Sequence, residues 1–317
     1  MKTVLKILLA PFLWVAQSCS PLGSPVDDEL SKNHYYNNSK SDVIYSMNGN
    51  WFGIGKTEMN VDAKSFKVLS EYFSKDKNQI YFMANVVKHP DVDISSFTSN
   101  TTNLKHDIGV DKNSVYYVEK NNLRIIPNAN PKSYQKLNIS WGKDRENYFY
   151  EHKKVSVDYN SFKMLNRQFS IDNDSVYVHH YGDFKSIDAD VTSFKILEKS
   201  DYAFDNSRIY YFYIADNEFG YELLEIPYIL GSKMELYNKN YLRIDDKVYF
   251  MGQPVPGVAI NSFKILSDVY AKDSVHVYFN GKIISEADTK TFHIPTGEFV
   301  PEDKNGSYIG GKLKSKS

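Results

Sequence analysis

The sequence predicts an all-β protein built from tandem hairpin repeats of about 32 residues, arranged as an open, solenoid-like array. One recurring pattern reads Asp-x-x-Ser-Phe-Lys-x-Leu. A second, with Asp-Lys-Asn followed by a β-branched residue and Tyr, alternates with it. The chain also holds 25 Tyr and 19 Phe, enough to fill an aromatic core. A fixed period indicates one structural unit that must stack on its neighbours to bury that core.

The first half of each unit is marked by an aromatic residue that follows a hydroxyl-bearing residue. Four positions before the aromatic stands Asp or Asn in every regular copy except one, where the residue is Ala259. An Asp three residues before a Ser is typical of a turn, because its carboxylate accepts backbone N–H groups that the turn leaves unpaired. The aromatics are Phe66, Phe97, Tyr134, Phe162, Phe194, Phe263 and Phe292, with a degraded copy at Tyr228.

The second half of each unit predicts a hairpin. Asp-Lys-Asn suits the loop, and the β-branched and aromatic residues after it suit a strand. The dipeptide Asn280-Gly281 predicts a further hairpin, so we expect three or four short strands per unit and almost no helix. The aspartates of this half, here called the motif aspartates, are Asp76, Asp111, Asp144, Asp172, Asp205, Asp273 and Asp303.

An aromatic residue follows each motif aspartate by five positions and forms a column along the array. Because side chains alternate along a strand, residues on both faces of this strand are apolar, which predicts a strand packed between two layers. The tyrosines then form a buried ladder. Alternatively, they form an exposed row that binds a glycan or a protein partner, but their recurrence with the turns favours the ladder. The candidate binding residues are Tyr81, Tyr116, Tyr177, Tyr210 and Tyr278, with Trp51 and Trp141.

A closed β-propeller is the alternative architecture, because the first and last segments are complementary halves of a unit that can pair to form a last blade. Units of 28 to 37 residues are short for four-stranded blades, which favours the open array. The unit at 214–250 is the least regular: it carries an inserted stretch from Ala215 to Tyr221, and Asp245 precedes Tyr249 by one residue too few. A function specific to this protein is expected near that insertion.

The N-terminus predicts a leader. Lys2 and Lys6 precede an apolar run, and the only cysteine, Cys19, follows a small residue at the expected cleavage point. We therefore expect a lipoprotein-type signal peptide at 1–18, lipidation of Cys19 and anchoring to a membrane of the bacterial cell envelope. The alternative is ordinary cleavage after Ser18, which gives a secreted or periplasmic protein. The predicted organisation is completed by a flexible tether at 19–40, the β-repeat domain at 41–310 and a basic tail at 311–317.

No pattern in the sequence predicts catalysis, a cofactor or a metal. His179 and His180 are adjacent on a predicted strand and point to opposite faces, so they do not share an ion. The Asp-Lys-Asn loops lack the further acidic ligands of a calcium site. A formal net charge of −1 without a basic stripe argues against a nucleic-acid partner. The sequence thus predicts a protein that is not an enzyme.

The strings Asp76-Lys77-Asn78-Gln79-Ile80-Tyr81 and Asp111-Lys112-Asn113-Ser114-Val115-Tyr116-Tyr117 resemble the DKNYY family of bacterial envelope and secreted proteins. The resemblance covers roughly residues 41–310 and implies a repeat architecture without an established activity. Together with the leader it predicts a non-enzymatic envelope lipoprotein that acts as a binding or scaffold module through its β-repeat surface. A glycan- or cell-wall-binding module is the alternative.

Overall fold

The computed structural model describes residues 20–100, 108–214 and 220–314. The chain divides into two compact units, Met1–Ser156 and Val157–Ser317. Both units consist of small antiparallel sheets, and the only helical segments in the described residues are the 3-10 turns η1 (Met47–Gly49) and η2 (Ile260–Ser262). None of the described helical segments is long and apolar enough to cross a membrane. Cys19 and the predicted leader lie outside the described residues.

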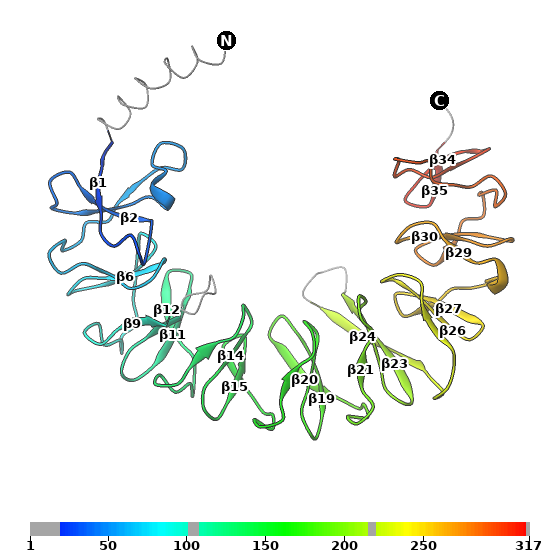
Figure 1. Cartoon of the computed structure of the whole chain (residues 1–317), viewed down its shortest axis with the longest axis horizontal. Coiled ribbons are helices and arrows are strands. Elements are labelled where there is room, and N and C mark those ends of the chain that lie inside the picture. Colours follow the sequence, from blue (N-terminus) through cyan, green and yellow to red (C-terminus); the bar gives the residue numbers. More distant parts are fainter. Residues whose placement is uncertain (1–19, 101–107, 215–219, 315–317) are drawn as a thin grey trace, which may run out of the picture. The chain divides into compact units, whose positions relative to one another are not determined.

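The first unit contains four sheets of four strands, which follow one another in chain order (Figure 1). The first sheet is β1 (Leu22–Pro25), β2 (His34–Asn37), β3 (Val43–Tyr45) and β4 (Thr57–Glu58); the second is β5 (Lys67–Val68), β6 (Phe73–Lys75), β7 (Ile80–Phe82) and β8 (Asn85–Val87). The third is β9 (Thr98–Asn100), β10 (Ile108–Val110), β11 (Val115–Glu119) and β12 (Asn122–Ile125); the fourth is β13 (Gln135–Lys136), β14 (Trp141–Lys143), β15 (Tyr148–Tyr150) and β16 (Lys153–Val155).

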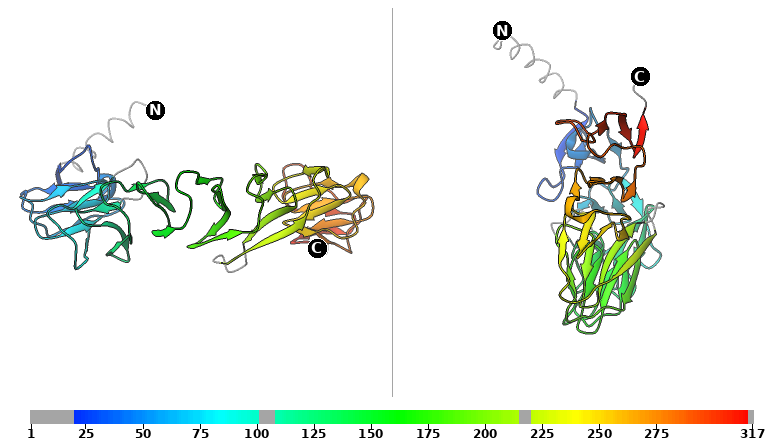
Figure 2. Two further views of the ribbon diagram at one scale, coloured as in Figure 1. Left: turned by 90° about the horizontal axis from the view of Figure 1, so that it is seen from below. Right: turned by 90° about the vertical axis from the view of Figure 1, so that its right-hand side faces the viewer.

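The second unit contains four further sheets of four strands and a last sheet of three, seen from two more directions in Figure 2. They comprise β17 (Lys163–Met164), β18 (Phe169–Ile171), β19 (Val176–His180) and β20 (Asp183–Ile187); then β21 (Lys195–Ile196), β22 (Tyr202–Phe204), β23 (Arg208–Ile214) and β24 (Tyr221–Pro227). Next come β25 (Met234–Leu236), β26 (Tyr241–Ile244), β27 (Lys247–Phe250) and β28 (Gln253–Pro254); β29 (Lys264–Ile265), β30 (Tyr270–Lys272), β31 (Val277–Phe279) and β32 (Lys282–Ile283); and finally β33 (Glu302–Asp303), β34 (Gly306–Ile309) and β35 (Lys312–Lys314).

The predicted all-β architecture of tandem hairpin repeats is confirmed. Each repeat is a meander in which neighbouring strands pair antiparallel, and no sheet in the described residues closes into a barrel. The sheets have three or four strands, as expected, and the short repeats accommodate them because most strands are only two to five residues long. Asn280 and Gly281 both have positive φ, 49° and 70°, as a two-residue hairpin between β31 and β32 requires.

The third strand of a repeat is packed on both faces, as its sequence predicts. Tyr81 of β7 belongs to a buried cluster with Val43, Met59 and Phe66. Its neighbour Ile80 points the other way and lies in the next cluster, which is centred on Phe97 and Tyr116. The core is therefore not a single body but a series of aromatic clusters, each between two successive sheets.

A column of small residues stands opposite the tyrosine column, and the sequence reasoning overlooked it. Ser74 pairs with Tyr81, and Gly109 pairs with Tyr116. A Cβ at Gly109 would overlap the ring of Phe97, so the absence of a side chain makes room for the aromatic of the first half. The other members are Gly142, Ser170, Ala203 and Ala271, opposite Phe149, Tyr177, Tyr210 and Tyr278.

The predicted tether is wrong over its described part, because residues 22–37 supply β1 and β2 of the first sheet. Its polar residues bond to backbone instead of remaining solvated: Asn33 Oδ1 accepts from Asn48 N–H at 2.8 Å, and Asn37 Oδ1 accepts from Ser41 N–H at 2.9 Å. His34, the first residue of β2, is fully buried.

The predicted basic tail at 311–317 is also wrong as far as Lys314. Lys312–Lys314 forms β35, in which Leu313 pairs with Tyr308 of β34. The lysines occupy the solvent-facing positions of the last strand, while Leu313 packs on the core around Tyr308.

Candidate functional site

The carboxylate of each motif aspartate holds its repeat together. In the second sheet, Asp76 Oδ1 accepts the N–H groups of Asn78 and Gln79 at 2.7 and 2.8 Å, which closes the loop between β6 and β7. Its Oδ2 accepts the N–H of Asp62 at 3.1 Å and the hydroxyl of Tyr81 at 2.9 Å. Burial alone would raise the pKa of Asp76, but these hydrogen bonds outweigh it and lower the pKa.

The same arrangement recurs in both units. Every motif aspartate accepts the backbone N–H of the residue that begins the first half of its own unit, at 2.6–3.1 Å. Every tyrosine of the column donates its hydroxyl to its own motif aspartate, at 2.8 or 2.9 Å. Where the column holds Phe149, the side-chain amide of Asn147 donates to Asp144 instead, at 3.2 Å to Oδ1 and 3.4 Å to Oδ2. In Asp205 the hydrogen bonds overcome the effect of burial and lower the pKa to about 2.

The constant spacing of residues in the first half of each unit also follows from hydrogen bonds that hold the repeat together. The unit that begins with Ala259 keeps the hydrogen bond to its motif aspartate, because that bond uses the backbone N–H and no side chain. The Ala259 N–H donates to Asp273 at 2.7 Å. The hydroxyl before the aromatic accepts the N–H of the residue after the motif aspartate; Ser65 accepts from Lys77 at 3.1 Å. The Lys77 ammonium in turn pairs with the Asp62 carboxylate at 2.6 Å. The repeated polar residues thus serve the fold.

The tyrosine column is buried, so it is not an exposed binding row. The tyrosines proposed as binding residues expose at most 8% of their surface: Tyr81, Tyr116, Tyr177, Tyr210 and Tyr278. Trp141 is also buried, at 3%. Of the candidates only Trp51 is partly exposed, in the loop before β4 where its ring meets Phe52 edge-on at 5.7 Å. This burial contradicts the alternative of an exposed binding row, and it agrees with the buried ladder that the recurrence with the turns favours. The tyrosine hydroxyls are turned inward to the motif aspartates.

The adjacent histidines of β19 lie on opposite faces, as expected for neighbours on a strand. His179 packs parallel to the Phe184 ring with centroids 6.1 Å apart, whereas His180 meets Phe212 edge-on at 5.3 Å. Burial lowers the pKa of His179 to about 4. Within the described ranges, no three His, Cys, Asp or Glu side chains are grouped as a metal ion needs.

A hollow lies in the second unit, beside the irregular repeat. It is a groove of about 630 Å³ with apolar walls and four polar side chains. Charges of opposite sign, Glu222 and Lys282, lie among its lining residues. The groove is lined by Tyr213, Glu222 and Leu224 of the hairpin β23–β24, by Phe250, Met251, Gln253, Pro254 and Pro256 of the next repeat, and by Asn280, Gly281 and Lys282 of the one after.

The groove exists because one hairpin is longer than the others. Strands β23 and β24 each have seven residues, and they pair from Arg208 with Pro227 to Ile214 with Tyr221. The next hairpin approaches closely: a Cβ at Gly252 would overlap Tyr211 and Leu224, and the hydroxyl of Tyr202 accepts the Gly252 N–H at 2.9 Å. The longer hairpin β23–β24 therefore extends past the hairpin β27–β28 of the next repeat and forms one wall of the groove. The sequence placed an insertion here, but residues 215–219 of the predicted stretch lie outside the described residues.

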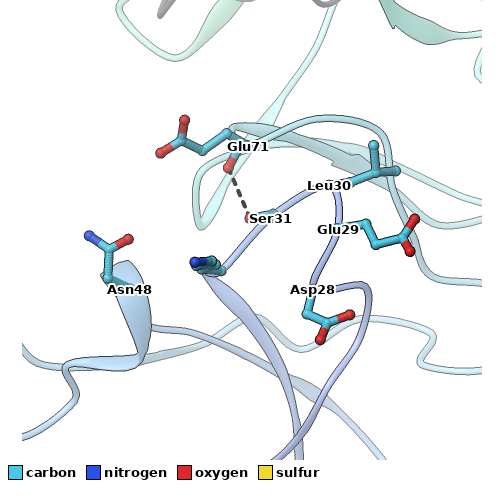
Figure 3. A pocket seen from close by; sticks show the side chains of 7 residues that line it. Asp28, Glu29, Leu30, Ser31, Asn48 and Glu71 are labelled. Atoms are coloured by element: carbon cyan, nitrogen blue, oxygen red, sulfur yellow. Dashed lines mark hydrogen bonds between the residues drawn. The ribbon is translucent and has the colours of Figure 1, made fainter.

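A second, smaller hollow of about 250 Å³ lies against the first sheet (Figure 3). Three acids line it, but the carboxylate of Glu71 points away from those of Asp28 and Glu29. The Ser31 hydroxyl donates to the carbonyl of Glu71 at 3.3 Å, which ties the first sheet to the second. We interpret this hollow as a junction between sheets.

The sequence matches no curated protein and no solved structure. A family model does match it: the model of the DKNYY family covers residues 89–212 and 169–312. These ranges contain every motif aspartate from Asp111 to Asp303 and the hairpin loops that follow them. On this match, and on the repeated geometry, the chain belongs to the DKNYY family.

Proposed function

We propose that this protein is a non-enzymatic binding or scaffold module of the bacterial cell envelope, held at a membrane by a lipid on Cys19. Its binding surface is the groove beside β24. The observation that carries this proposal is that the polar residues of the repeated motif are engaged in folding, whereas the groove arises where the repeat is broken. A site made by a single irregular repeat provides a specific surface on a generic scaffold.

The shape and chemistry of the groove support binding rather than catalysis. A mostly apolar lining with a few polar groups is typical of recognition sites. The amides of Gln253 and Asn280 and the charges of Glu222 and Lys282 come from three different repeats. Such a site recognises a ligand that spans the repeats.

A glycan- or cell-wall-binding module is the second candidate. The tyrosine row that was expected to bind the glycan does not support this candidate, because it is buried. Its support is now the ring of Tyr213 near the amides of Gln253 and Asn280, since sugars stack on aromatic faces and bond to amides.

The anchor is tested by cell fractionation. Cys19→Ala is expected to move the protein from the membrane fraction to the soluble envelope fraction without unfolding it. Persistence of this variant in the membrane fraction would contradict lipid anchoring.

The binding surface is tested by crosslinking in cells with a matched pair of variants. Lys282 and Lys312 are both exposed, and each follows a glycine at the start of the last strand of its sheet. We expect Lys282→Glu to lose the partners crosslinked to the wild type and Lys312→Glu to keep them. Equal crosslinking by both variants would show that the groove is not the surface.

A further inference from the structure

We propose that the outer edge of β24 binds an extended peptide segment of a partner protein, which pairs with it as a fifth strand. This inference rests on the proposed binding function and specifies how the groove is used. Peptides that add to a sheet edge gain affinity from main-chain hydrogen bonds and specificity from pockets for alternate side chains.

Strand β24 is unusual among the outer strands. It is the fourth strand of the order β21-β22-β23-β24, so one of its edges has no neighbour in the sheet. It has seven residues, whereas the other outer strands of the described sheets have two to five. Proteins normally keep such edges short, because a long edge invites pairing with another chain.

The register shows which backbone groups face outward. The N–H of Tyr228 donates to the Ser207 carbonyl at 2.9 Å, in the same register in which β23 and β24 pair. Hydrogen-bonded pairs alternate in an antiparallel ladder. The backbone N–H and C=O groups of the even-numbered residues of β24 therefore bond to β23, and those of the odd-numbered residues are directed away from β23. Leu223 and Glu225 therefore direct N–H and C=O groups to the open edge.

Two observations agree with this assignment. Pro227 has no N–H, and it occupies an odd-numbered position, where β23 needs no donor. Within the described part of the chain, the backbone amides of Leu223 and Glu225 have no hydrogen-bond partner. The edge thus offers unpaired donors at the spacing of a strand.

The groove supplies the side-chain pockets. The even-numbered Leu224 packs with Tyr211 and Tyr213 on the face that borders the groove, whereas Leu223 packs on the opposite face with Phe212. Alternate side chains of an added strand lie on the groove face, beside Leu224, Met251 and Pro254. We expect apolar residues at these positions.

The two glutamates of β24 favour a segment that places basic residues beside them, and they disfavour a second copy of this chain. Glu222 forms no ion pair with any described residue, and Glu225 approaches Arg208 only at 3.6 Å. Two copies paired through β24 would bring two glutamates from each chain to one junction, which like-charge repulsion opposes. A segment that brings lysine or arginine to these glutamates and an acidic residue to Lys282, among apolar residues, is complementary.

A displayed library of random heptapeptides, selected on the full-length Cys19→Ala protein, provides the test. We expect enriched peptides that alternate apolar residues and include lysine or arginine. Glu225→Pro removes the outward N–H and should weaken their binding about tenfold or more, whereas Glu225→Ala keeps the amide and should bind better than Glu225→Pro. The proline control is Ser186→Pro on β20, whose N–H also points outward by the register of β19 and β20.

The outcomes separate this inference from the proposed function. Leu223→Pro is a second variant with the same expected loss, and circular dichroism checks that each variant folds. The inference is overturned if no peptide is enriched, if folded Glu225→Pro and Leu223→Pro bind like the wild type, or if Ser186→Pro loses binding equally. A concentration-dependent dimer that Glu225→Pro abolishes would instead assign the edge to a second copy. If crosslinked partners depend on Lys282 but not on the Glu225 amide, the groove functions without strand pairing.

Discussion

At the scale of single residues, the motif aspartate is a multiple acceptor in the interior of each repeat. In the unit of Asp172, it receives the N–H groups of Asp174 and Ser175, the N–H of Asp158 and the hydroxyl of Tyr177. Two of these bonds close a local loop, the third fixes Tyr177 five residues further on in the same hairpin, and the fourth joins Asp158, 14 residues away in the sequence. A capping residue that stabilised only a turn would form the loop-closing bonds and no others.

Replacement of Asp172 tests this role. Asp172→Ala leaves a buried tyrosine hydroxyl and several N–H groups without their acceptor, and unsatisfied buried groups cost about 1–3 kcal/mol each. We expect the free energy of unfolding to fall by about 3 kcal/mol or more, above the ~1 kcal/mol typical of a lost helix cap. Urea denaturation measures it. Asp174→Ala, an exposed position in the same loop, is the control and should change stability little. Equal effects of the two substitutions would refute the role assigned to Asp172.

At the scale of elements, lysine side chains connect one sheet to the turn that begins the next. Lys75 at the end of β6 donates to the carbonyls of Ile94, Ser95 and Phe97 at 2.9, 3.0 and 2.7 Å. In the second unit, Lys272 at the end of β30 donates to Thr289 and Phe292 at 3.1 and 2.6 Å. These carbonyls belong to the turn that carries the next aromatic, so the lysine fixes the position of that ring.

The stability contribution of this contact is measurable with a matched pair. Lys75 and Lys67 are directly paired across β5 and β6, but Lys67 is exposed and donates to no described carbonyl. Lys75→Met should lower the free energy of unfolding by about 1.5–3 kcal/mol, because hydrogen bonds from a charged donor are lost. Lys67→Met should change it by less than about 0.5 kcal/mol. A loss of stability in both variants, or in neither, contradicts the assignment.

At the scale of the whole molecule, buried titratable groups limit the pH range of the fold. Burial lowers the pKa of His34 and of His179 to about 4, from 6.5 in the unfolded chain. Burial, with the hydrogen bond to its motif aspartate, raises the pKa of Tyr116 and of Tyr177 to about 12, from 10.0. Each group is held neutral, and it opposes folding once it must charge.

The pH dependence of stability follows with a defined sign. A depressed histidine pKa means that stability is complete above about pH 6.5 and falls toward pH 4. Asp205, whose pKa is lowered to about 2, adds a further loss between about pH 4 and 2. The raised tyrosine pKa values give stability that is complete below about pH 10 and lost toward pH 12. Thermal unfolding between pH 3 and 12 should show a plateau with two flanks. His179→Gln should reduce the loss between pH 6.5 and 4; an unchanged acid flank would contradict the role of this histidine.

The sequence by itself determined the repeat, its turns, the buried tyrosine ladder and the location of the irregular unit at 214–250. These features depend on hydrogen bonds over a few residues and on the alternation of side chains along a strand, both of which are written locally. Asp76, Asn78 and Tyr81, for example, lie within six residues of one another. A polar segment such as 22–37 was misjudged because composition does not reveal that Asn33 and Asn37 bond to backbone.

Only the tertiary structure decided which contacts form between segments that are distant in the sequence. The acceptance of the Asp62 N–H by Asp76, the space that Gly109 leaves for Phe97 and the groove between Leu224, Met251 and Lys282 all arise when segments 12 or more residues apart are packed together. The direction of the Glu225 amide likewise depends on the register of β23 and β24, and a shift of one residue would turn it inward. Packing between layers, which no local pattern encodes, therefore determines where the groove forms.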